Sequence, residues 1–422
     1  MYYLFYIPVG TEARVRQTPW GTITLACVNL GAFLYFGLTP GSEPDYYRFM
    51  LHPGAPSLFT SITSSFLHTG WIHLVSNLIY LGIFAPPIES RLGTVKFLAA
   101  YLCFAGLANL TQAWWMLRFT PDLASMPILG ASGAVAGVMG LFLVRLYFAR
   151  LKFTAVTLLY FQGITRVNKI ALPAFAAIIL WFVLQAVYQM AQPIEGTAYI
   201  SHLAGIAFGV GLGFLMGLAG EGRLERRLVV GDRYAERGEW YAALGEYEAY
   251  LAQRPHDSEV LIRAARVQRV THQSAASRDR FLETIACRLR GKDVEGACDA
   301  FDEMKRLLGD VPVPPGHLLR IARCFEERGR PSDASRAYES YGRHYPDAAG
   351  AATALLKCID IERKTLNNPG RAQYVCQELL KLSLPPDVEV LAKQRMDAVL
   401  EQLVKQRITI RETSSKKAKP AA

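Results

Sequence analysis

The chain has 422 residues, of which 46 are Lys or Arg and 36 are Asp or Glu, and its formal net charge is +10. The charged residues are divided unevenly, because residues 1–222 hold 18 of them and residues 223–422 hold the other 64. The first half is far too poor in charge for a soluble domain, which excludes a single soluble globule, a disordered chain and a small disulfide scaffold. The 7 cysteines have no paired spacing, so we expect reduced thiols and no metal site.

Six charge-free windows in the first half mark the expected membrane spans: residues 17–42, 49–88, 97–117, 123–144, 170–194 and 196–220. A helix needs about 20 apolar residues to cross a bilayer. The second window is too long for one span. Its first part, 49–70, is rich in Pro, Gly, Ser and Thr, so we expect an uncharged loop there and a helix over 71–88. The sequence therefore predicts an all-α bundle of six spans over residues 1–222.

The distribution of basic residues predicts the orientation of the bundle. If the N-terminus is cytoplasmic, nearly all Lys and Arg residues of the first half fall in inner segments, and only Arg48 and Arg118 fall in outer loops. Positive charge is enriched on the cytoplasmic side, so we expect both termini in the cytoplasm and the polar half to form a cytosolic domain. No convincing small-residue cleavage site follows the apolar start, and we expect no signal peptide.

Polar groups at membrane depth are costly, and each one suggests a function. The windows contain no Asp or Glu, which excludes an intramembrane aspartyl protease, and the absence of HExxH argues against a zinc protease. We single out His73, Asn77, Ser132 and His202. His73 and Asn77 are four residues apart and share one face of the second helix. Ser132 stands where the fourth span begins, and His202 near the outer end of the sixth.

Small residues surround the serine and follow the second of these histidines. Gly130 and Gly133 flank Ser132, and Gly133 and Gly137 are four residues apart on the same span. On the sixth span, Gly205, Gly209 and Gly213 also follow one another at intervals of four residues. Small residues at this spacing allow two helices to touch backbone to backbone. Such contact would bring the Ser132 hydroxyl within reach of the His202 imidazole. Each polar residue alone is explained by packing or by an interfacial position, but their common depth toward the outer leaflet favours a site.

These residues carry a resemblance that covers roughly residues 15–220. The runs HLVSNLIYLGIFAPPIESRLG, GASGAVAGVMG and SHLAGIAFGVGLG resemble the rhomboid family of intramembrane serine proteases, with HxxxN, GxSG and HxxG in the family's order. GxSG alone is weak, because α/β-hydrolases also flank a serine with glycines. The resemblance implies that Ser132 is the nucleophile, that His202 is the general base without a third acid, and that His73 and Asn77 line the oxyanion hole. It also implies a structural role for Glu89 and Arg91, and no metal or cofactor.

Two positions depart from the family. Many members carry Tyr or Phe four residues after the nucleophile, where this chain has Ala136, so the sequence leaves open which group orients His202. The Trp-Arg pair that some relatives have in the first loop is absent, and Tyr47-Arg48 matches it only faintly. Neither departure removes a reacting group, so we still expect activity.

The second half reads as helices over residues 223–412, followed by a basic disordered tail at 413–422. Six positions recur at an offset of 91 residues: Tyr234, Gly238, Ala243, Tyr247, Tyr250 and Pro255 correspond to Phe325, Gly329, Ala334, Tyr338, Tyr341 and Pro346. Their spacing resembles the tetratricopeptide repeat. Residues 291–304 are a degenerate copy, and 351–404 supply further, capping helices. The repeats would bind a protein or peptide, or would merely pack against one another.

Together these features predict an intramembrane serine endopeptidase of a bacterial inner membrane. It would cut transmembrane protein substrates near the outer face, with the membrane lipid around it, while the helical repeats recruit a substrate tail or partner. No nucleic-acid partner is expected. Two alternatives remain, a rhomboid-like binder without catalysis and a membrane-anchored repeat scaffold.

Overall fold

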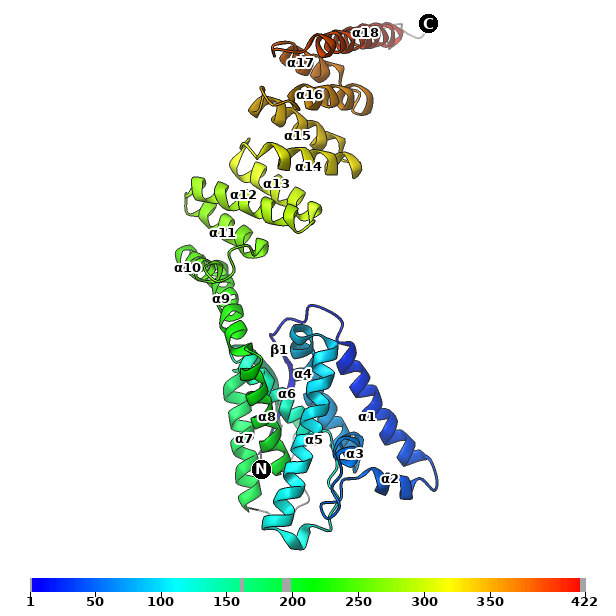
Figure 1. The fold of residues 1–422 in the computed structure, drawn as a ribbon, viewed down its shortest axis with the longest axis vertical. Coiled ribbons are helices and arrows are strands. Elements are labelled where there is room, and N and C mark those ends of the chain that lie inside the picture. Colours follow the sequence, from blue (N-terminus) through cyan, green and yellow to red (C-terminus); the bar gives the residue numbers. More distant parts are fainter. Residues whose placement is uncertain (1, 160–162, 192–198, 418–422) are drawn as a thin grey trace. The chain divides into compact units, whose positions relative to one another are not determined.

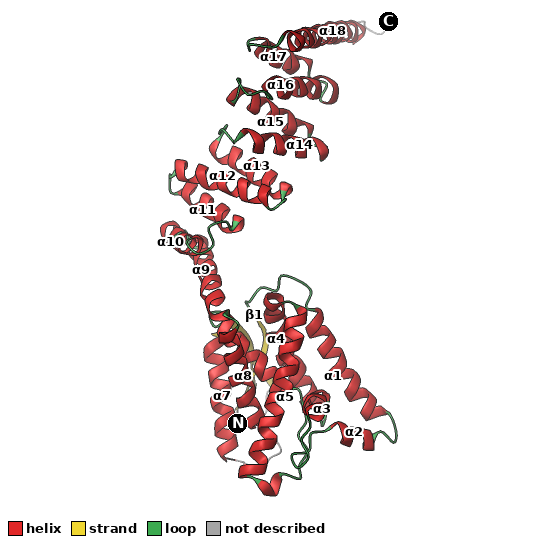
Figure 2. Ribbon diagram, viewed as in Figure 1, coloured by secondary structure: helices red, strands yellow, loops and turns green. Residues whose placement is uncertain are grey.

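The computed structural model describes residues 2–159, 163–191 and 199–417, and helices make up most of them (Figure 2). The chain divides into two compact units, Met1–Arg226 and Arg227–Ala422. The boundary falls inside helix α9 (Leu218–Glu236), four residues beyond the position where charge begins to rise in the sequence.

The first unit is a helical bundle around α6. Its other helices are α1 (Trp20–Leu38), α2 (Glu43–Phe49), α3 (Leu58–Thr63), α4 (Trp71–Leu92), α5 (Thr94–Phe119), α7 (Ala174–Ala191) and α8 (Tyr199–Leu215), with short turns η1 (Ser64–Phe66) and η2 (Pro121–Leu123). Helix α6 (Ser132–Arg145) packs against α4, α5 and α8, and nearly all of its side chains are buried (Figure 1). The core of the unit therefore follows the fourth predicted span.

Three of the described helices, α1, α4 and α5, are long and apolar enough to cross a membrane. Helices α8 and α9 meet the same criterion together, with a bend of 81° between them, and α6 and the first part of α7 are apolar but shorter. These helices overlap the windows expected from the sequence, although α4 and α5 extend beyond the ends of theirs. The count of six spans stays a prediction, because length and composition support three spans and a bent fourth.

The first unit also contains a small sheet, so the fold is mainly helical and not entirely α as the sequence predicted. Strands β1 (Tyr2–Thr11), β2 (Arg150–Leu159) and β3 (Gly163–Pro173) pair antiparallel in the order β1-β2-β3. Strands β2 and β3 form a hairpin in which Phe153 faces Ile170. The basic residues of 150–169 had marked this segment as an inner loop, but between them lie β-branched and aromatic residues that favour strands.

A buried carboxylate anchors the start of α1. Helix α4 continues past the predicted end of its span to Leu92 and so includes Glu89, which is fully buried. Glu89 accepts hydrogen bonds from the backbone N–H of Gly21 at 2.6 Å and of Thr22 at 2.8 Å, and from the hydroxyls of Thr22 and Thr94 at 2.7 Å. The two backbone N–H groups are free donors at the N-terminus of α1, where negative charge is also favoured. The contacts describe a structural carboxylate.

A second charged cluster joins the ends of α4 and α6 to α9. Glu225, on α9, forms ion pairs with Arg91 of α4 and Arg145 at the end of α6, the latter at 2.8 Å. The side chains of all three residues are at most 14 % exposed. Removal of one partner from such a cluster leaves an uncompensated buried charge, which is strongly destabilising.

The second unit is a succession of helices, each packed against the next: α10 (Trp240–Leu251), α11 (Ser258–Val270), α12 (Ser274–Arg290), α13 (Val294–Leu308), α14 (Pro315–Glu327), α15 (Pro331–His344), α16 (Ala351–Asp360), the π-helical turn η3 (Ile361–Thr365), α17 (Pro369–Leu380) and α18 (Pro386–Lys417). Helix α18 continues five residues into the expected disordered tail, and residues 418–422 lie outside the described residues.

Four of the turns between these helices share one backbone conformation. The turn residues Gly238, His272, Lys292 and Gly329 have φ of 76°, 61°, 61° and 67°. In each turn, the next N–H bonds the carbonyl five residues before it, as Arg330 does to Phe325 at 2.9 Å. This left-handed residue with its backward hydrogen bond is a common helix stop. Two of these turn residues, Gly238 and Gly329, are a pair that corresponds at the 91-residue offset.

The predicted repeat positions pack inside the second unit. Ala243 and Ala334 are fully buried, and the rings of Tyr247 and Tyr338 are at most 2 % exposed. The Tyr338 hydroxyl donates to Glu326 at 2.9 Å. Assignment to the tetratricopeptide family stays a prediction, but these contacts show that the aromatic and Ala positions hold neighbouring helices together.

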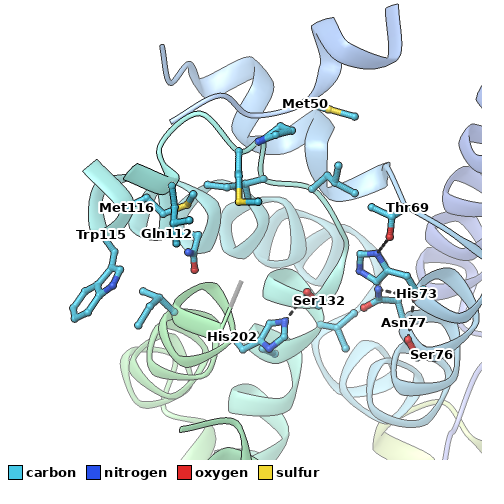
Figure 3. Close-up of a pocket in the computed structure, with 18 of the residues that line it drawn as sticks. Met50, Thr69, His73, Ser76, Asn77, Gln112, Trp115, Met116, Ser132 and His202 are labelled. Carbon is cyan, nitrogen blue, oxygen red and sulfur yellow. Dashed lines mark hydrogen bonds between the residues drawn. The ribbon is translucent and has the colours of Figure 1, made fainter. Parts of the chain in front are cut away.

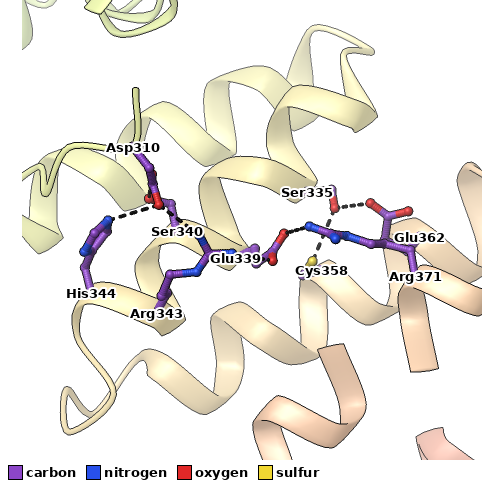
Figure 4. Close-up of polar contacts among 9 residues, drawn as sticks. All are labelled: Asp310, Ser335, Glu339, Ser340, Arg343, His344, Cys358, Glu362 and Arg371. Atoms are coloured by element: carbon purple, nitrogen blue, oxygen red, sulfur yellow. Dashed lines mark hydrogen bonds and ion pairs between the residues drawn. The ribbon is translucent and has the colours of Figure 1, made fainter. Parts of the chain in front are cut away.

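Ion pairs add to this packing farther along the second unit. Glu339 of α15 accepts from Arg343 at 2.9 Å and from Arg371 of α17 at 2.5 Å, and Ser335 donates to Glu362 (Figure 4). Glu339 and Glu362 are both buried, so each carboxylate is held by a partner from another turn or helix. Such satisfied polar contacts fix how α15 meets η3 and α17.

Candidate active site

Ser132 and His202 meet at the contact between α6 and α8. Ser132 is the first residue of α6, and His202 lies in the first turn of α8. The Nε2 atom of His202 is 2.7 Å from the Ser132 hydroxyl oxygen, and the histidine is 7 % exposed (Figure 3). This is hydrogen-bonding distance between a nucleophilic group and a base. The structure therefore brings together two residues that are 70 positions apart in the chain.

The two helices reach this distance because glycine lines their contact. A Cβ atom added to Gly209 would lie 2.9 Å from the carbonyl carbon of Gly137, and one added to Gly205 would lie 3.1 Å from the nitrogen of Gly137. Carbon atoms in ordinary contact are farther apart, so any larger residue would force the helices to separate. Gly133 is equally confined, because an added Cβ would overlap the Ser201 hydroxyl and lie 3.0 Å from Ala108.

Two aromatic rings flank the His202 imidazole. The Trp181 ring of α7 has its centroid 5.6 Å from that of His202 at an interplanar angle of 35°, and the Tyr199 ring is 6.3 Å away at 86°. Ala136 is buried and carries no ring. Ala136 left open which group orients His202, and the structure places the Trp181 and Tyr199 rings beside its imidazole. Tyr199 precedes His202 by one helical turn, but the sequence contains no signal that would bring Trp181 here.

His73 and Asn77 come from α4 and form the opposite side of the site. His73 Nδ1 is 3.2 Å from the Thr69 hydroxyl, and the Asn77 amide donates to the His73 carbonyl at 2.9 Å. The His73 ring lies so close to Gly130 that an added Cβ there would be 2.8 Å from its Nε2 atom. Gly130 also has φ of 120°, which disfavours any side chain. Both observations require glycine at this position.

A cavity of about 830 Å³ opens between these two sides, and it is lined by Ser132, His202, His73 and Asn77 together with apolar residues of α5 and the loop before α6. Figure 3 shows Thr69, His73, Ser76 and Asn77 on one side of Ser132, and Gln112, Trp115 and Met116 toward the other. A cavity of this size can hold several residues of an extended chain. It therefore places a peptide-sized space against the Ser132 hydroxyl.

Other polar residues beside the site were not singled out from the sequence. Asn109 and Gln112 lie in α5, and Ser201 directly precedes His202. All three are buried, and Ser201 donates hydrogen bonds to both Gln112 and Asn109. The signal was available, because each is a polar residue in a charge-free window and polar groups at membrane depth call for partners.

The first unit is also similar in sequence to known proteins. Residues 55–219 match the rhomboid domain. The chain is 28 % identical to Rhomboid-like protein 11, chloroplastic, of Arabidopsis thaliana over 199 residues, and this aligned region covers 46 % of this chain and 65 % of that protein. It is 29 % identical over 265 residues to Rhomboid protein 1, mitochondrial, of Saccharomyces cerevisiae, covering 53 % and 71 %. It is 26 % identical over 129 residues to Rhomboid protease GlpG of Haemophilus influenzae, covering 30 % and 63 %.

These findings support the rhomboid family for the first unit. The matched region contains Ser132, His202, His73 and Asn77, and it ends at residue 219, before the helical second unit. The rhomboid domain and the apolar helices together make this an integral membrane protein. The chain spans 65 % of the Arabidopsis relative and 63 % of the Haemophilus one.

Proposed function

We propose that the protein is an intramembrane serine endopeptidase that uses Ser132 and His202 as a catalytic dyad. The observation that carries the proposal is the 2.7 Å hydrogen bond between the His202 imidazole and the Ser132 hydroxyl, at the wall of a peptide-sized cavity. A serine hydroxyl is a weak nucleophile until an adjacent base takes its proton. The rhomboid domain match over residues 55–219 supports the same chemistry.

In the proposed reaction, the Ser132 oxygen attacks the scissile carbonyl carbon while His202 Nε2 accepts the hydroxyl proton. The protonated imidazole then gives that proton to the leaving amine, which leaves an acyl ester on Ser132. Water, deprotonated by the same nitrogen, hydrolyses the ester and restores the serine. The Trp181 and Tyr199 rings confine the imidazole while it exchanges protons.

The negative oxygen that develops on the carbonyl needs hydrogen-bond donors. We assign this role to His73, to Asn77 and to the backbone N–H of Ser132, which is among the free donors at the start of α6. One hydrogen of the Asn77 amide is used by the His73 carbonyl, and an amide has a second one to offer. If the Thr69 hydroxyl donates to His73 Nδ1, the proton of His73 is on Nε2, ready to be donated.

The length of α6 supports a reaction below the membrane surface. Its 14 residues extend about 21 Å, less than the roughly 30 Å of a bilayer core. If the Arg145 end lies at the inner surface, Ser132 at the other end lies inside the outer leaflet. The open cavity would then supply water. Substrates would be transmembrane segments with helix-weakening residues, because a stable helix keeps its carbonyls hydrogen-bonded.

The remaining assignments complete the proposal. Six spans, with both termini in the cytoplasm of a bacterium, would place the second unit in the cytosol, although two of the relatives named above are mitochondrial and chloroplast proteins. The second unit would recruit a cytosolic segment of the substrate or a partner protein. Its successive helices are built as one stacked array, which supports a binding surface of this kind.

The rival is a rhomboid-like binder without catalysis, which would keep the cavity but not the reaction. The test is labelling of the purified full-length protein with a fluorophosphonate probe, which reacts with activated serines. We expect labelling that disappears in Ser132→Ala while the variant keeps the thermal stability of the parent. Failure of the folded parent protein to label would refute the dyad, and labelling that persists in Ser132→Ala would assign it to another serine.

A further inference from the structure

A buried polar network beside the dyad is centred on Asn109, in the middle of α5. The Asn109 side-chain nitrogen donates to the carbonyl of Ser61 at 3.1 Å and lies 3.2 Å and 3.0 Å from the hydroxyls of Ser64 and Ser65. Its side-chain oxygen accepts a hydrogen bond from the Ser201 hydroxyl at 3.2 Å. Asn109 is 2 % exposed, and the four serines are at most 1 % exposed.

Each end of this network leads to one of the two residues of the dyad. On one side, the Ser64 carbonyl accepts the N–H of Gly130, at 2.9 Å, in the loop that ends at Ser132. On the other side, Ser201 directly precedes His202, and its own N–H is held by the Gln112 side chain of α5 at 3.0 Å. Asn109 therefore connects the loop before α6 with the first turn of α8.

We propose that Asn109 is a positioning residue that holds the Ser132 hydroxyl and the His202 imidazole at hydrogen-bonding distance. The inference rests on the proposed function. Asn109 is not among the residues that line the cavity, so it acts through Ser64 and Ser201 and not on the substrate. In apolar surroundings a fully bonded amide is rigid, because moving it leaves several buried polar groups without partners. Both segments that carry the reacting groups are thus tied to one side chain.

The first test compares Asn109→Leu with Asn29→Leu as a matched control. Asn29 is also a buried amide in a helix of the first unit, 1 % exposed, and it bonds the Leu25 carbonyl at 2.7 Å. Both changes replace a buried amide by an apolar side chain of similar size. We expect both variants to lose thermal stability, but only Asn109→Leu should slow fluorophosphonate labelling and kcat, by about 100-fold with little change in KM, as expected for a displaced catalytic group.

The second test removes one hydroxyl from the network. Ser201→Ala keeps the backbone bond to Gln112 and loses only the bond to Asn109. It should slow labelling less than Asn109→Leu does. The double variant should be no slower than Asn109→Leu alone, because the Ser201 hydroxyl acts only through Asn109 and interacting residues are not additive. If Asn109→Leu does not fold, Ser201→Ala decides the matter.

The outcomes separate this inference from the proposed function. Unchanged labelling and kcat in folded Asn109→Leu, or in Ser201→Ala when the first variant does not fold, would overturn the inference and leave Asn109 a folding role. Equal slowing by Asn29→Leu would overturn it as well, because the effect would then be general destabilisation. A parent protein that neither labels at Ser132 nor cleaves a substrate overturns the proposed function, and the inference with it.

Discussion

The contact between α6 and α8 makes Gly209 the most sensitive small residue in the bundle. In Gly209→Ala, the new Cβ would lie 2.9 Å from the carbonyl carbon of Gly137 and 3.0 Å from the Cα of Gly140, and it would overlap the Gly137 oxygen. Ordinary contact begins near 3.4 Å, and the overlap with the Gly137 oxygen sets the demand, so the helices must separate by at least about 1 Å. Backbone atoms form the obstacle, and no side chain can rotate to relieve it.

The same helix offers a control that isolates this effect. Gly211 is two residues further along α8, and an added Cβ would meet no atom within 4 Å. Ala is better than Gly in a helix by about 1 kcal/mol, so Gly211→Ala should be neutral or stabilising. Overpacking costs about 1–3 kcal/mol, so the two variants should differ by about 2–4 kcal/mol in the free energy of unfolding. For a unit of this size, that difference lowers the unfolding midpoint by roughly 5–15 °C.

The separation of the helices should also affect the dyad, because His202 lies two turns before Gly209 on α8. A shift of this size would stretch the 2.7 Å hydrogen bond to Ser132 and slow serine labelling by up to about 100-fold. The assay records thermal unfolding of both variants in detergent and their labelling rates well below the midpoint. If Gly209→Ala matches Gly211→Ala in both measurements, the backbone contact does not exist as described.

Four further predictions address the site and the second unit. His202→Ala should abolish labelling and cleavage while the protein still folds, because the base is lost; residual cleavage by the purified variant would contradict the dyad. Asn77→Ala should keep labelling measurable but lower kcat by about 100- to 1000-fold, and an unchanged kcat would return Asn77 to a packing role. Removal of the chain after Arg226, which keeps the Glu225 ion pairs, should spare cleavage of a short model substrate and weaken cleavage of one with a cytosolic segment; equal loss on both substrates would show that the second unit serves folding. Tyr338→Ser should lower the unfolding midpoint of the second unit far more than Tyr338→Phe, which loses only the two hydrogen bonds of the hydroxyl with Glu326 and Lys357, each worth about 1 kcal/mol; equal effects would mean that the buried ring contributes little.

The amino-acid sequence by itself determines where the apolar helices lie and which residues are unusual within them. Hydropathy locates α1, α4 and α5, because burial in lipid requires long runs without charge. Polar residues such as Ser132 and His202 stand out from these runs. Local signals also located the turns at Gly238 and Gly329, because a left-handed residue between two helices favours glycine.

Tertiary structure decided which of these residues meet. The bond between Ser132 and His202 depends on backbone contact between α6 and α8, and the ring of Trp181 reaches His202 from a third helix. Asn109 gains its place only when residues of α3, η1 and α8 surround it, at separations of 44 to 92 residues in the chain. The three-stranded sheet likewise pairs the N-terminus with residues beyond 150. Such contacts are set by packing between distant segments, and local periodicity carries no record of them.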